Sequence, residues 1–163
     1  MKAPNHIAGG ICFTGFFASL WNINIFESAD TLAFTAIACI LPDIDHTRSL
    51  IGKTVYPFAR WIDKKWGHRT ITHSFIFLTV ISLTFFILEK HFSDNYTYST
   101  ILFFAIFSHY ILDMLTVQGI PLFYPFFRNP CVIPGRPTMR IRSNDNRAEL
   151  MAFLLFILIS LSS

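Results

Sequence analysis

Five apolar runs, separated by polar connections, most constrain what this chain can fold into. The runs cover residues 7–26, 31–42, 75–88, 100–117 and 148–161. A helix that crosses a bilayer needs about 20 apolar residues. The first and fourth runs reach that length, whereas the other three need flanking residues or a locally thinner bilayer in order to span it. The pattern predicts an all-α membrane protein that forms a compact bundle of about five apolar helices.

The composition supports residence in a membrane. Hydrophobic residues make up 53% of the 163 residues and charged residues make up 14%, whereas soluble domains have about 45–50% and about 25%. The core of one small domain cannot bury so much apolar surface, so part of it should face lipid. The length suits one domain, and we expect residues 1–163 to form a single membrane-embedded unit.

The connection after the second run should carry a helix of its own. Ile51, Val55, Phe58 and Ile62 recur there at helical spacing, with basic residues between them. This pattern predicts an amphipathic helix, bent at Pro57, that lies on an anionic lipid surface. An ordinary surface helix fits the same pattern equally well.

The connection before the last run is expected to be irregular. It contains five prolines, which exclude one long helix. Residues 131–133 and 138–142 flank a Pro-Gly turn signal. This arrangement predicts a small β-hairpin in the loop before the last helix.

The basic residues predict an orientation. If all five runs cross the membrane, every Lys and Arg except Lys90 lies on the side of the N-terminus. Loops rich in Lys and Arg stay in the cytoplasm, so we expect a cytoplasmic N-terminus and a C-terminus across the membrane. Because topology alone accounts for the basic side, a nucleic-acid partner is not favoured.

Histidines and carboxylates gather at the cytoplasmic ends of the predicted helices. His109 and Asp113 are four residues apart, so both can reach a common ion from one helix face. The predicted metal ligands are His6, Asp43, Asp45, His46, His68, His73, His109, Asp113 and Glu149. Imidazole nitrogen with carboxylate oxygen suits Zn²⁺, Mn²⁺ or Fe²⁺. Five histidines and four carboxylates exceed one tetrahedral shell, which predicts two or three divalent ions, with Zn²⁺ favoured.

Each of these elements alone also has an ordinary explanation. Asp43 and Asp45 could end and cap a helix, and His109 with Asp113 could form a structural hydrogen-bonded pair. Their shared position on one side of the membrane favours a functional site, because ionisable groups within a bilayer are costly without partners.

Five motifs along the chain resemble those of one known family. They are LPDIDH at 41–46, GHRTITHS at 67–74, SHYILDMLT at 108–116, GIPLFYP at 119–125 and NRAEL at 146–150. The family is the YdjM-like family of bacterial, LexA-regulated, inner-membrane-associated proteins described as metal-dependent hydrolases. The resemblance implies a multi-pass protein of the inner membrane, hydrolytic activity and a link to the SOS response.

A more distant resemblance implies the kind of bond that is cleaved. The His109 and Asp113 spacing looks like the His-x-x-x-Asp pair of the zinc-dependent phospholipase C and single-strand nuclease superfamily. Those helical enzymes hold up to three zinc ions and cleave phosphoesters. Glu149 departs from their pattern, since Asp145 rather than a histidine precedes it by four residues, and this puts the third metal site in doubt.

These features favour a metal-dependent hydrolase that uses metal-activated water on a lipid or soluble phosphoester at the cytoplasmic membrane face. Asp45 and Arg69 are the predicted catalytic residues, and Arg69 would also hold the phosphate as a bidentate fork. The predicted substrate-binding residues are Arg69, Thr72, Arg140 and Arg142. The alternatives are a metal or proton transporter and a structural or regulatory metal-binding membrane protein. The transporter is less favoured, because its ligands should lie near the membrane midplane.

Overall fold

The computed structural model describes residues 2–92 and 96–142. Its named elements are α1 (Ala3–Ser19), α2 (Ala29–Ile40), η1 (Leu41–Asp45), α3 (Leu50–Thr54), α4 (Tyr56–Trp66), η2 (Ile71–His73), α5 (Phe75–Phe92), α6 (Thr97–Met114) and η3 (Pro137–Met139). Within the described ranges all of these are α-helices or short 3₁₀ helices (η), so the helical fold class is confirmed there. Four of the five predicted apolar helices correspond to α1, α2, α5 and α6. The fifth, at 148–161, and Glu149 lie outside the described residues.

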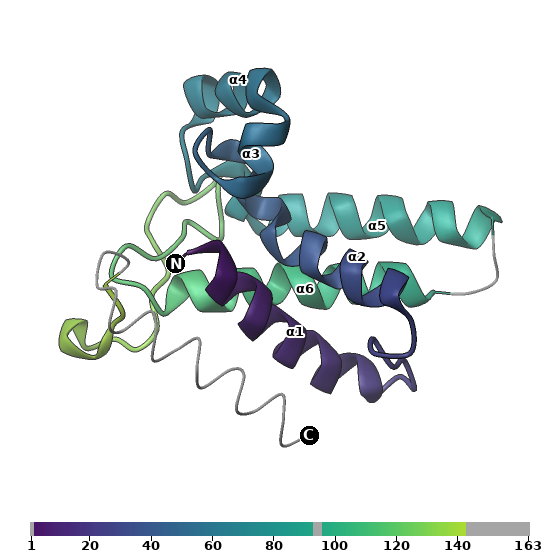
Figure 1. Ribbon diagram of the computed structural model, residues 1–163. Helices are drawn as coiled ribbons and strands as arrows, with labels where there is room; N and C mark the ends of the chain where they lie inside the picture. Colours follow the sequence, from purple (N-terminus) through teal and green to yellow (C-terminus); the bar gives the residue numbers. More distant parts are fainter. Residues whose placement is uncertain (1, 93–95, 143–163) are drawn as a thin grey trace.

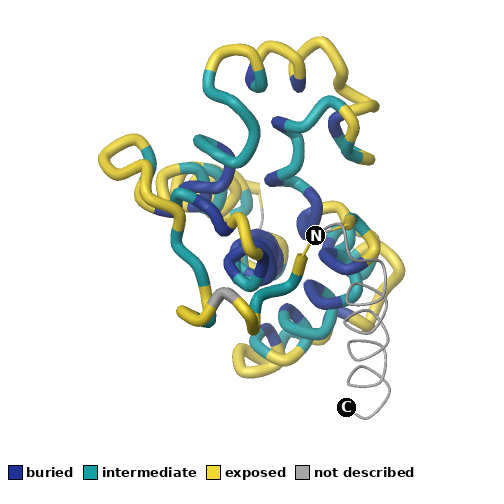
Figure 2. The backbone as a smooth tube through the Cα atoms, turned by 90° about the vertical axis from the view of Figure 1, so that its left-hand side faces the viewer, coloured by how far each residue is buried: buried dark blue, intermediate teal, exposed yellow. Residues whose placement is uncertain are grey.

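Helix α6 is the central element of the bundle and packs against α1, α2 and α5 (Figure 1). Its side chains Ile101, Leu102, Ala105 and Ile106 are buried. Figure 2 shows the buried parts of the backbone gathered at the centre and the exposed parts around them. A central helix held on several sides can position the side chains of its C-terminal half accurately.

Glycine at position 10 lets α1 approach its neighbours closely. A Cβ atom on Gly10 would collide with the Sγ atom of Cys39 in α2, and it would lie 3.1 Å from the Oγ atom of Ser108 in α6. The close approach brings the first turns of α1 against both helices.

The first helix is shorter than predicted. Helix α1 ends at Ser19, although the apolar run continues to residue 26. Asn22 adopts a left-handed conformation with a φ of 58°, and the Asn24 side chain accepts a hydrogen bond from the Phe26 N–H. Asparagine tolerates that conformation and bonds readily to nearby backbone groups, so a turn replaces the end of the predicted helix.

By length and composition, α5 is the one helix in the described ranges that could cross a membrane. Its 18 residues, at about 1.5 Å per residue, give about 27 Å, close to the hydrocarbon thickness of about 30 Å. Val80, Leu83 and Ile87 are among its exposed side chains. Helix α2, with 12 residues, is too short to span a bilayer alone. One candidate helix does not support five crossings, so multi-pass insertion and its orientation stay predictions.

The predicted amphipathic helix is present as two helices, α3 and α4. The break lies at Val55, whose φ of −117° and ψ of 42° are not helical, rather than at Pro57. Pro57 is in the first turn of α4, where its missing N–H removes no hydrogen bond. Ile62 is buried, whereas Phe58 is about half exposed, so the predicted apolar stripe is divided between two faces.

The predicted β-hairpin is wrong: within residues 131–142 the two proposed strands do not pair with each other. The isolated bridges are Ile120 with Cys131 and Thr116 with Ile141. The N–H groups of Ile133 and Ile141 donate to the carbonyl groups of Met114 and Leu115, at 2.8 and 3.0 Å. The last carbonyl groups of a helix have no partner within it. Both segments therefore bond to the chain at the end of α6.

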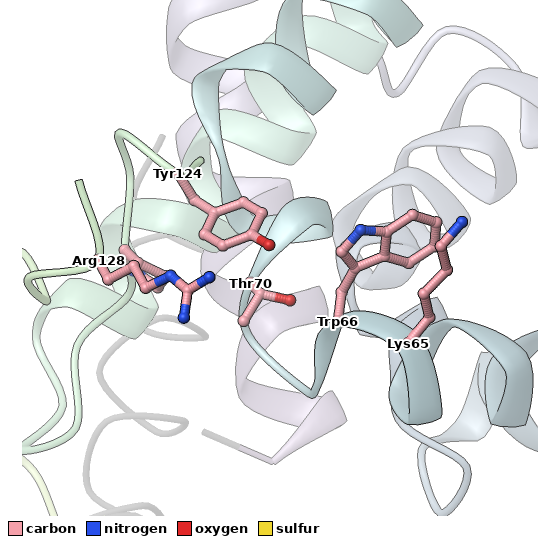
Figure 3. Close-up of a pocket in the computed structure, with 6 residues that line it drawn as sticks. Lys65, Trp66, Thr70, Tyr124 and Arg128 are labelled. Atoms are coloured by element: carbon pink, nitrogen blue, oxygen red, sulfur yellow. The ribbon is translucent and has the colours of Figure 1, made fainter. Parts of the chain in front are cut away.

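A cavity of about 240 Å³ lies between the C-terminal end of α4 and the turn that follows α6 (Figure 3). Its lining residues are Lys65, Trp66, Thr70, Pro121, Tyr124 and Arg128. Thr70 belongs to the connection between α4 and η2, which also carries predicted metal ligands. The cavity therefore adjoins the segment of greatest functional interest.

Candidate metal centre

Predicted ligands from four separate segments meet at one end of the helix bundle. His6 lies in the first turns of α1, Asp43 in η1, His73 in η2, and His109 and Asp113 in the C-terminal half of α6. In Figure 1 this is the end where the N-terminus lies beside the end of α6. These segments are distant in sequence, so tertiary packing brings their side chains together.

Three ligand atoms, from His73, His109 and Asp113, lie close to one another, and Asp43 adjoins the two histidines. The Nε2 atoms of His73 and His109 are 3.2 Å apart. Asp113 Oδ2 lies 3.6 Å from the first and 3.8 Å from the second, and Asp43 Oδ1 lies 3.9 Å and 3.7 Å from them. Ligand atoms that are each about 2.1 Å from a tetrahedral ion are about 3.4 Å apart. The observed separations match that spacing.

A backbone carbonyl group determines the tautomer of His109. Its Nδ1 atom lies 2.8 Å from the carbonyl oxygen of Cys39. A carbonyl oxygen can only accept a hydrogen bond, so Nδ1 must carry the hydrogen. In the neutral ring, Nε2 then presents a lone pair to the other ligand atoms.

Thr72 determines the tautomer of His73 in the same way. The Thr72 hydroxyl donates to Asp45 Oδ2 and lies 3.0 Å from His73 Nδ1. Because its hydrogen is directed at Asp45, the hydroxyl oxygen can only accept from His73. Nδ1 of His73 is therefore the protonated nitrogen, and its Nε2 also presents a lone pair.

The four atoms are thus all acceptors, with no hydrogen among them. Lone pairs and carboxylate oxygens at this distance repel one another unless a positive charge lies between them. One extra proton on a ring would link a single pair of these atoms, whereas a divalent cation would contact the atoms of His73, His109 and Asp113 together. Two imidazoles with two carboxylates form a donor set that Zn²⁺, Mn²⁺ and Fe²⁺ accept. The residues therefore fit a metal ion.

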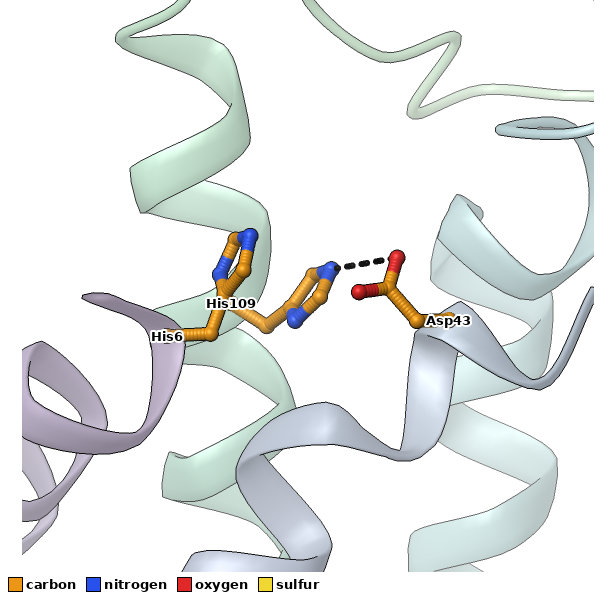
Figure 4. Close-up of side chains that lie close together, drawn as sticks. All are labelled: His6, Asp43 and His109. Carbon is orange, nitrogen blue, oxygen red and sulfur yellow. Dashed lines mark ion pairs between the residues drawn. The ribbon is translucent and has the colours of Figure 1, made fainter. Parts of the chain in front are cut away.

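Two further groups of three ligands adjoin this set. Asp43 lies near Asp45 and His68, and His6 lies near Asp43 and His109, with the ligand atoms of each group within 4.8 Å of one another. The rings of His6 and His109 stack with centroids 3.8 Å apart, and Asp43 faces His109 (Figure 4). The Nδ1 atom of His6 is buried and has no hydrogen-bond partner in the described part of the chain. Asp43 belongs to both groups, so its carboxylate could bridge two ions.

Asp45 is placed to position other residues rather than to bind an ion directly. It is completely buried, and its oxygens accept hydrogen bonds from His68 Nδ1, the Arg69 N–H and the Thr72 hydroxyl. Burial alone would raise the pKa of Asp45, but hydrogen bonds from His68 and His73, and their charges, hold that pKa well below its ordinary value. The predicted catalytic carboxylate is therefore an anion that orients two histidines.

Arg69 contacts the centre from its edge. Its Nη2 donates to Asp113 Oδ1 and its Nη1 donates to Gln118 Oε1, both at 2.9 Å. Its φ of 58° is uncommon for a residue with a side chain, and such strain occurs often at functional sites. The Nε atom is buried and has no hydrogen-bond partner among residues 2–92 and 96–142. One donor of the guanidinium group is therefore not satisfied by the described residues.

The remaining predicted site residues have other surroundings. His46 stacks on His68 with centroids 4.5 Å apart and belongs to none of the three ligand groups. Burial, followed by the charge of His68, lowers the pKa of His46. Thr72 is buried and bonded within the centre, so it does not face a substrate. Arg140 donates to two loop carbonyl groups, and Arg142 is exposed.

Sequence reasoning missed several groups that support the centre. The buried Tyr110 hydroxyl lies 2.8 Å from the Thr72 carbonyl oxygen and 3.0 Å from that of Ser74, so it ties η2 to α6. Tyr110 could have been identified from the sequence, because it is a polar residue next to His109 within an apolar run. The Cys39 carbonyl group has no such signal, because backbone atoms are the same in every residue. Gln118 lies after α6 and likewise lacks one.

Comparisons with known proteins identify the family of this chain. A family model described as "YdjM inner membrane protein" matches residues 1–163. The uncharacterized protein YvsG of Bacillus subtilis (strain 168) is 34% identical over 125 residues, which are 77% of this chain and 74% of YvsG. The inner membrane protein YdjM of Escherichia coli (strain K12) is 33% identical over 105 residues, which are 61% of this chain and 53% of that protein. No solved structure is significantly similar to the chain. The chain belongs to the YdjM inner membrane protein family.

Proposed function

We propose that this protein is a metal-dependent hydrolase that cleaves a phosphoester at the membrane surface. The observation that carries the proposal is the set of four acceptor atoms from Asp43, His73, His109 and Asp113, which lie 3.2–3.9 Å apart in the pairs given above. One divalent ion would be held by His73, His109 and Asp113, with Asp43 beside it. A second would be held beside it by Asp43 and His68, and Zn²⁺ is favoured for both.

Divalent ions in such a centre lower the pKa of bound water to about 7 and offset the negative charge of phosphoryl oxygens. The residues of the chain supply orientation and charge around them. Thr72 and the Cys39 carbonyl group keep the two Nε2 lone pairs directed inward. Asp45 orients His68 through a hydrogen bond of 2.8 Å.

Arg69 supports a phosphoester as the substrate. It is held against Asp113 at 2.9 Å, and its Nε donor has no hydrogen-bond partner in the described ranges. A guanidinium group at this place would stabilise phosphoryl oxygens that approach the ions. The likeness of the His109 and Asp113 pair to that of zinc-dependent phospholipases is a second, weaker support.

The location and regulation of the protein are further proposals. The distribution of basic residues favours several crossings of the inner membrane, with the N-terminus and the metal centre in the cytoplasm. Membership of an inner membrane protein family supports the membrane but not the number of crossings. Control by LexA in the SOS response rests on the family resemblance alone.

Transport of metal ions or protons is the alternative function. Buried histidines and carboxylates in apolar helices also mark ion pathways, and His109 and Asp113 are completely buried. The ligands nevertheless gather at one end of the bundle rather than midway along it, which favours a surface reaction.

The test combines metal analysis with activity of the full chain purified in detergent. We expect elemental analysis to find on the order of two divalent ions per chain. The metal-loaded protein should hydrolyse at least one member of a panel of phospholipids and small phosphoesters. Chelation should abolish this activity and Zn²⁺ should restore it. Metal-loaded protein that cleaves nothing in the panel, yet moves metal across proteoliposomes, would establish the transporter instead.

A further inference from the structure

The cavity beside the metal centre carries unneutralised positive charge. Lys65 and Arg128 line it, and no acidic residue does. Neither cation forms an ion pair with another residue of the described ranges. Figure 3 shows Arg128 and Tyr124 on one side of Thr70, and Trp66 with Lys65 on the other. The charge around the cavity is therefore that of an anion site.

Aromatic rings hold the two cations in place. The Lys65 Nζ atom lies 4.3 Å from the centroid of the Trp66 ring. The Arg128 guanidinium carbon lies 5.9 Å from the centroid of the Tyr124 ring. Such cation–π contacts restrict the cations but leave their N–H groups available. The Thr70 hydroxyl already donates to a backbone carbonyl group at 2.7 Å, so Lys65, Arg128 and Tyr124 supply the donors for a ligand.

The size of the cavity limits the ligand. A volume of about 240 Å³ is below the roughly 300–1,000 Å³ of pockets that enclose drug-sized molecules. It suits a phosphate with a few attached atoms. Arg and Lys together are the usual binders of phosphate.

Exposed aromatic side chains flank the cavity on both sides. Phe58 and Trp61 of α4 are about half exposed, and in the turn after α6 Phe123, Phe126 and Phe127 are between 51% and 79% exposed. Aromatic side chains beside basic residues are typical of surfaces that lie at the level of lipid headgroups. A phosphate that enters the cavity from this surface would belong to a membrane lipid.

The cavity and the metal centre share a wall. Arg69 contacts Asp113 in the centre, and the next residue, Thr70, lines the cavity. The Phe75 N–H donates to the Leu122 carbonyl group at 2.9 Å, which ties the turn after α6 to the start of α5. A lipid held in the cavity would therefore lie beside the ions.

We propose that this cavity is a binding site for the phosphate group of an anionic phospholipid. The binding itself requires only Lys65, Arg128 and Tyr124. The consequence that such a lipid is the substrate class of the metal centre rests on the proposed hydrolase function.

The test measures binding of short-chain dihexanoyl phosphatidic acid to the full chain in nonionic detergent, with EDTA present so that no metal takes part. We expect saturable binding of this lipid and much weaker binding of dihexanoyl phosphatidylcholine and inorganic phosphate. The double variant Lys65→Gln/Arg128→Gln should weaken lipid binding by about tenfold or more, because two charged donors are lost.

The matched control is Lys64→Gln/Arg136→Gln, which removes the same charge from two exposed residues that do not line the cavity. Its affinity should stay within about twofold of the parent chain, since neither side chain lines the cavity. Equal losses in the two double variants would overturn the site, and inorganic phosphate that competes as well as the lipid would overturn the lipid assignment. Intact lipid binding in a metal-loaded protein that cleaves neither lipids nor small phosphoesters would reject the hydrolase and leave the binding site standing.

Discussion

At the residue scale, the metal centre depends on which nitrogen of His73 carries the hydrogen, and Thr72 controls this. We expect Thr72→Val, which keeps the shape of the side chain but removes the hydroxyl, to weaken Zn²⁺ binding about 10–100-fold, the usual effect of losing a group that orients a ligand. Thr72→Ser should restore most of the affinity. A competition titration with a chelating dye measures both. An unchanged dissociation constant for Zn²⁺ in Thr72→Val would show that Thr72 does not determine the tautomer of His73.

Loss of a metal ligand should weaken metal binding more than Thr72→Val does. We expect His73→Ala, His109→Ala and Asp113→Ala each to remove most of the bound metal, because each deletes one of four neighbouring donor atoms. His46→Ala should have less effect, since His46 belongs to none of the ligand groups. Elemental analysis of the purified variants provides the measurement. The control is His91→Ala, in the last turn of α5, and equal metal content in all five variants would reject the centre.

Arg69 distinguishes an enzyme from a transporter. We expect Arg69→Lys and Arg69→Ala to keep bound metal and to lose phosphoester turnover, alanine more than lysine, because lysine keeps the charge without the planar fork. A charged hydrogen bond contributes about 1.5–3 kcal/mol, so the alanine variant should be slower by about 10–150-fold. Metal content and initial rates are measured on the same samples. A repulsive cation does not help metal transport, so metal flux that survives in Arg69→Ala without any hydrolysis would favour the transporter.

The side chains that meet at the candidate centre could be identified from the sequence, but the groups that orient them could not. His73, His109 and Asp113 are rare residue types within or beside apolar runs, and this made them visible. The role of Asp45 as an orienting anion depends on four neighbours that only the folded chain brings together. The Cys39 carbonyl group is a backbone atom without any sequence signature.

At the element scale, the approach of α1 to α2 and α6 depends on Gly10. Alanine in a helix is favoured over glycine by about 1 kcal/mol, but overpacking costs about 1–3 kcal/mol. Because the new Cβ would collide with Cys39 Sγ, we expect Gly10→Ala to lower the melting temperature in detergent. Gly135→Ala is the control, since nothing lies within 4 Å of its Cβ. Adding Cys39→Ala removes the sulfur and should restore stability; a double variant that melts as low as Gly10→Ala would contradict this packing.

Hydrophobic runs predicted the helices well, whereas the local turn signal predicted a β-hairpin that does not form. The positions of α2, α5 and α6 follow their apolar runs closely, because burial along a helix face leaves a long pattern in the sequence. The Pro-Gly signal near residue 135 predicted a hairpin. The competing partner was the end of α6, whose free carbonyl groups at Met114 and Leu115 accept the N–H groups of Ile133 and Ile141. Such partners are remote in sequence, so short motifs do not reveal them.

At the scale of the whole molecule, the polar chemistry is confined to one end. The ligand groups and the basic cavity gather around the start of α5 and the end of α6. The far end of α5 carries Lys90 and His91. This asymmetry gives the described part of the molecule one polar end and one largely apolar body, which is the arrangement that the proposed surface hydrolase requires.

The orientation of that polar end is the last prediction. Helix α5 runs away from the candidate metal centre, because it begins at Phe75, two residues after His73. The segments before α5 hold Lys53, Arg60 and Lys64, whereas Lys90 is the single Lys or Arg near its other end. The positive-inside rule therefore directs the start of α5 and the metal centre to the cytoplasm.

Reporter insertions test this orientation directly. Alkaline phosphatase inserted after Phe92 should be active, because the end of α5 would lie in the periplasm, and a fluorescent protein inserted after Trp66 should fluoresce in the cytoplasm. The control exchanges the two reporters, which should silence both. Active phosphatase after Trp66 would place the metal centre in the periplasm, where it could not act on lipids of the cytoplasmic leaflet. Fluorescence after Phe92 as well as after Trp66 would mean that α5 lies on the membrane without crossing it.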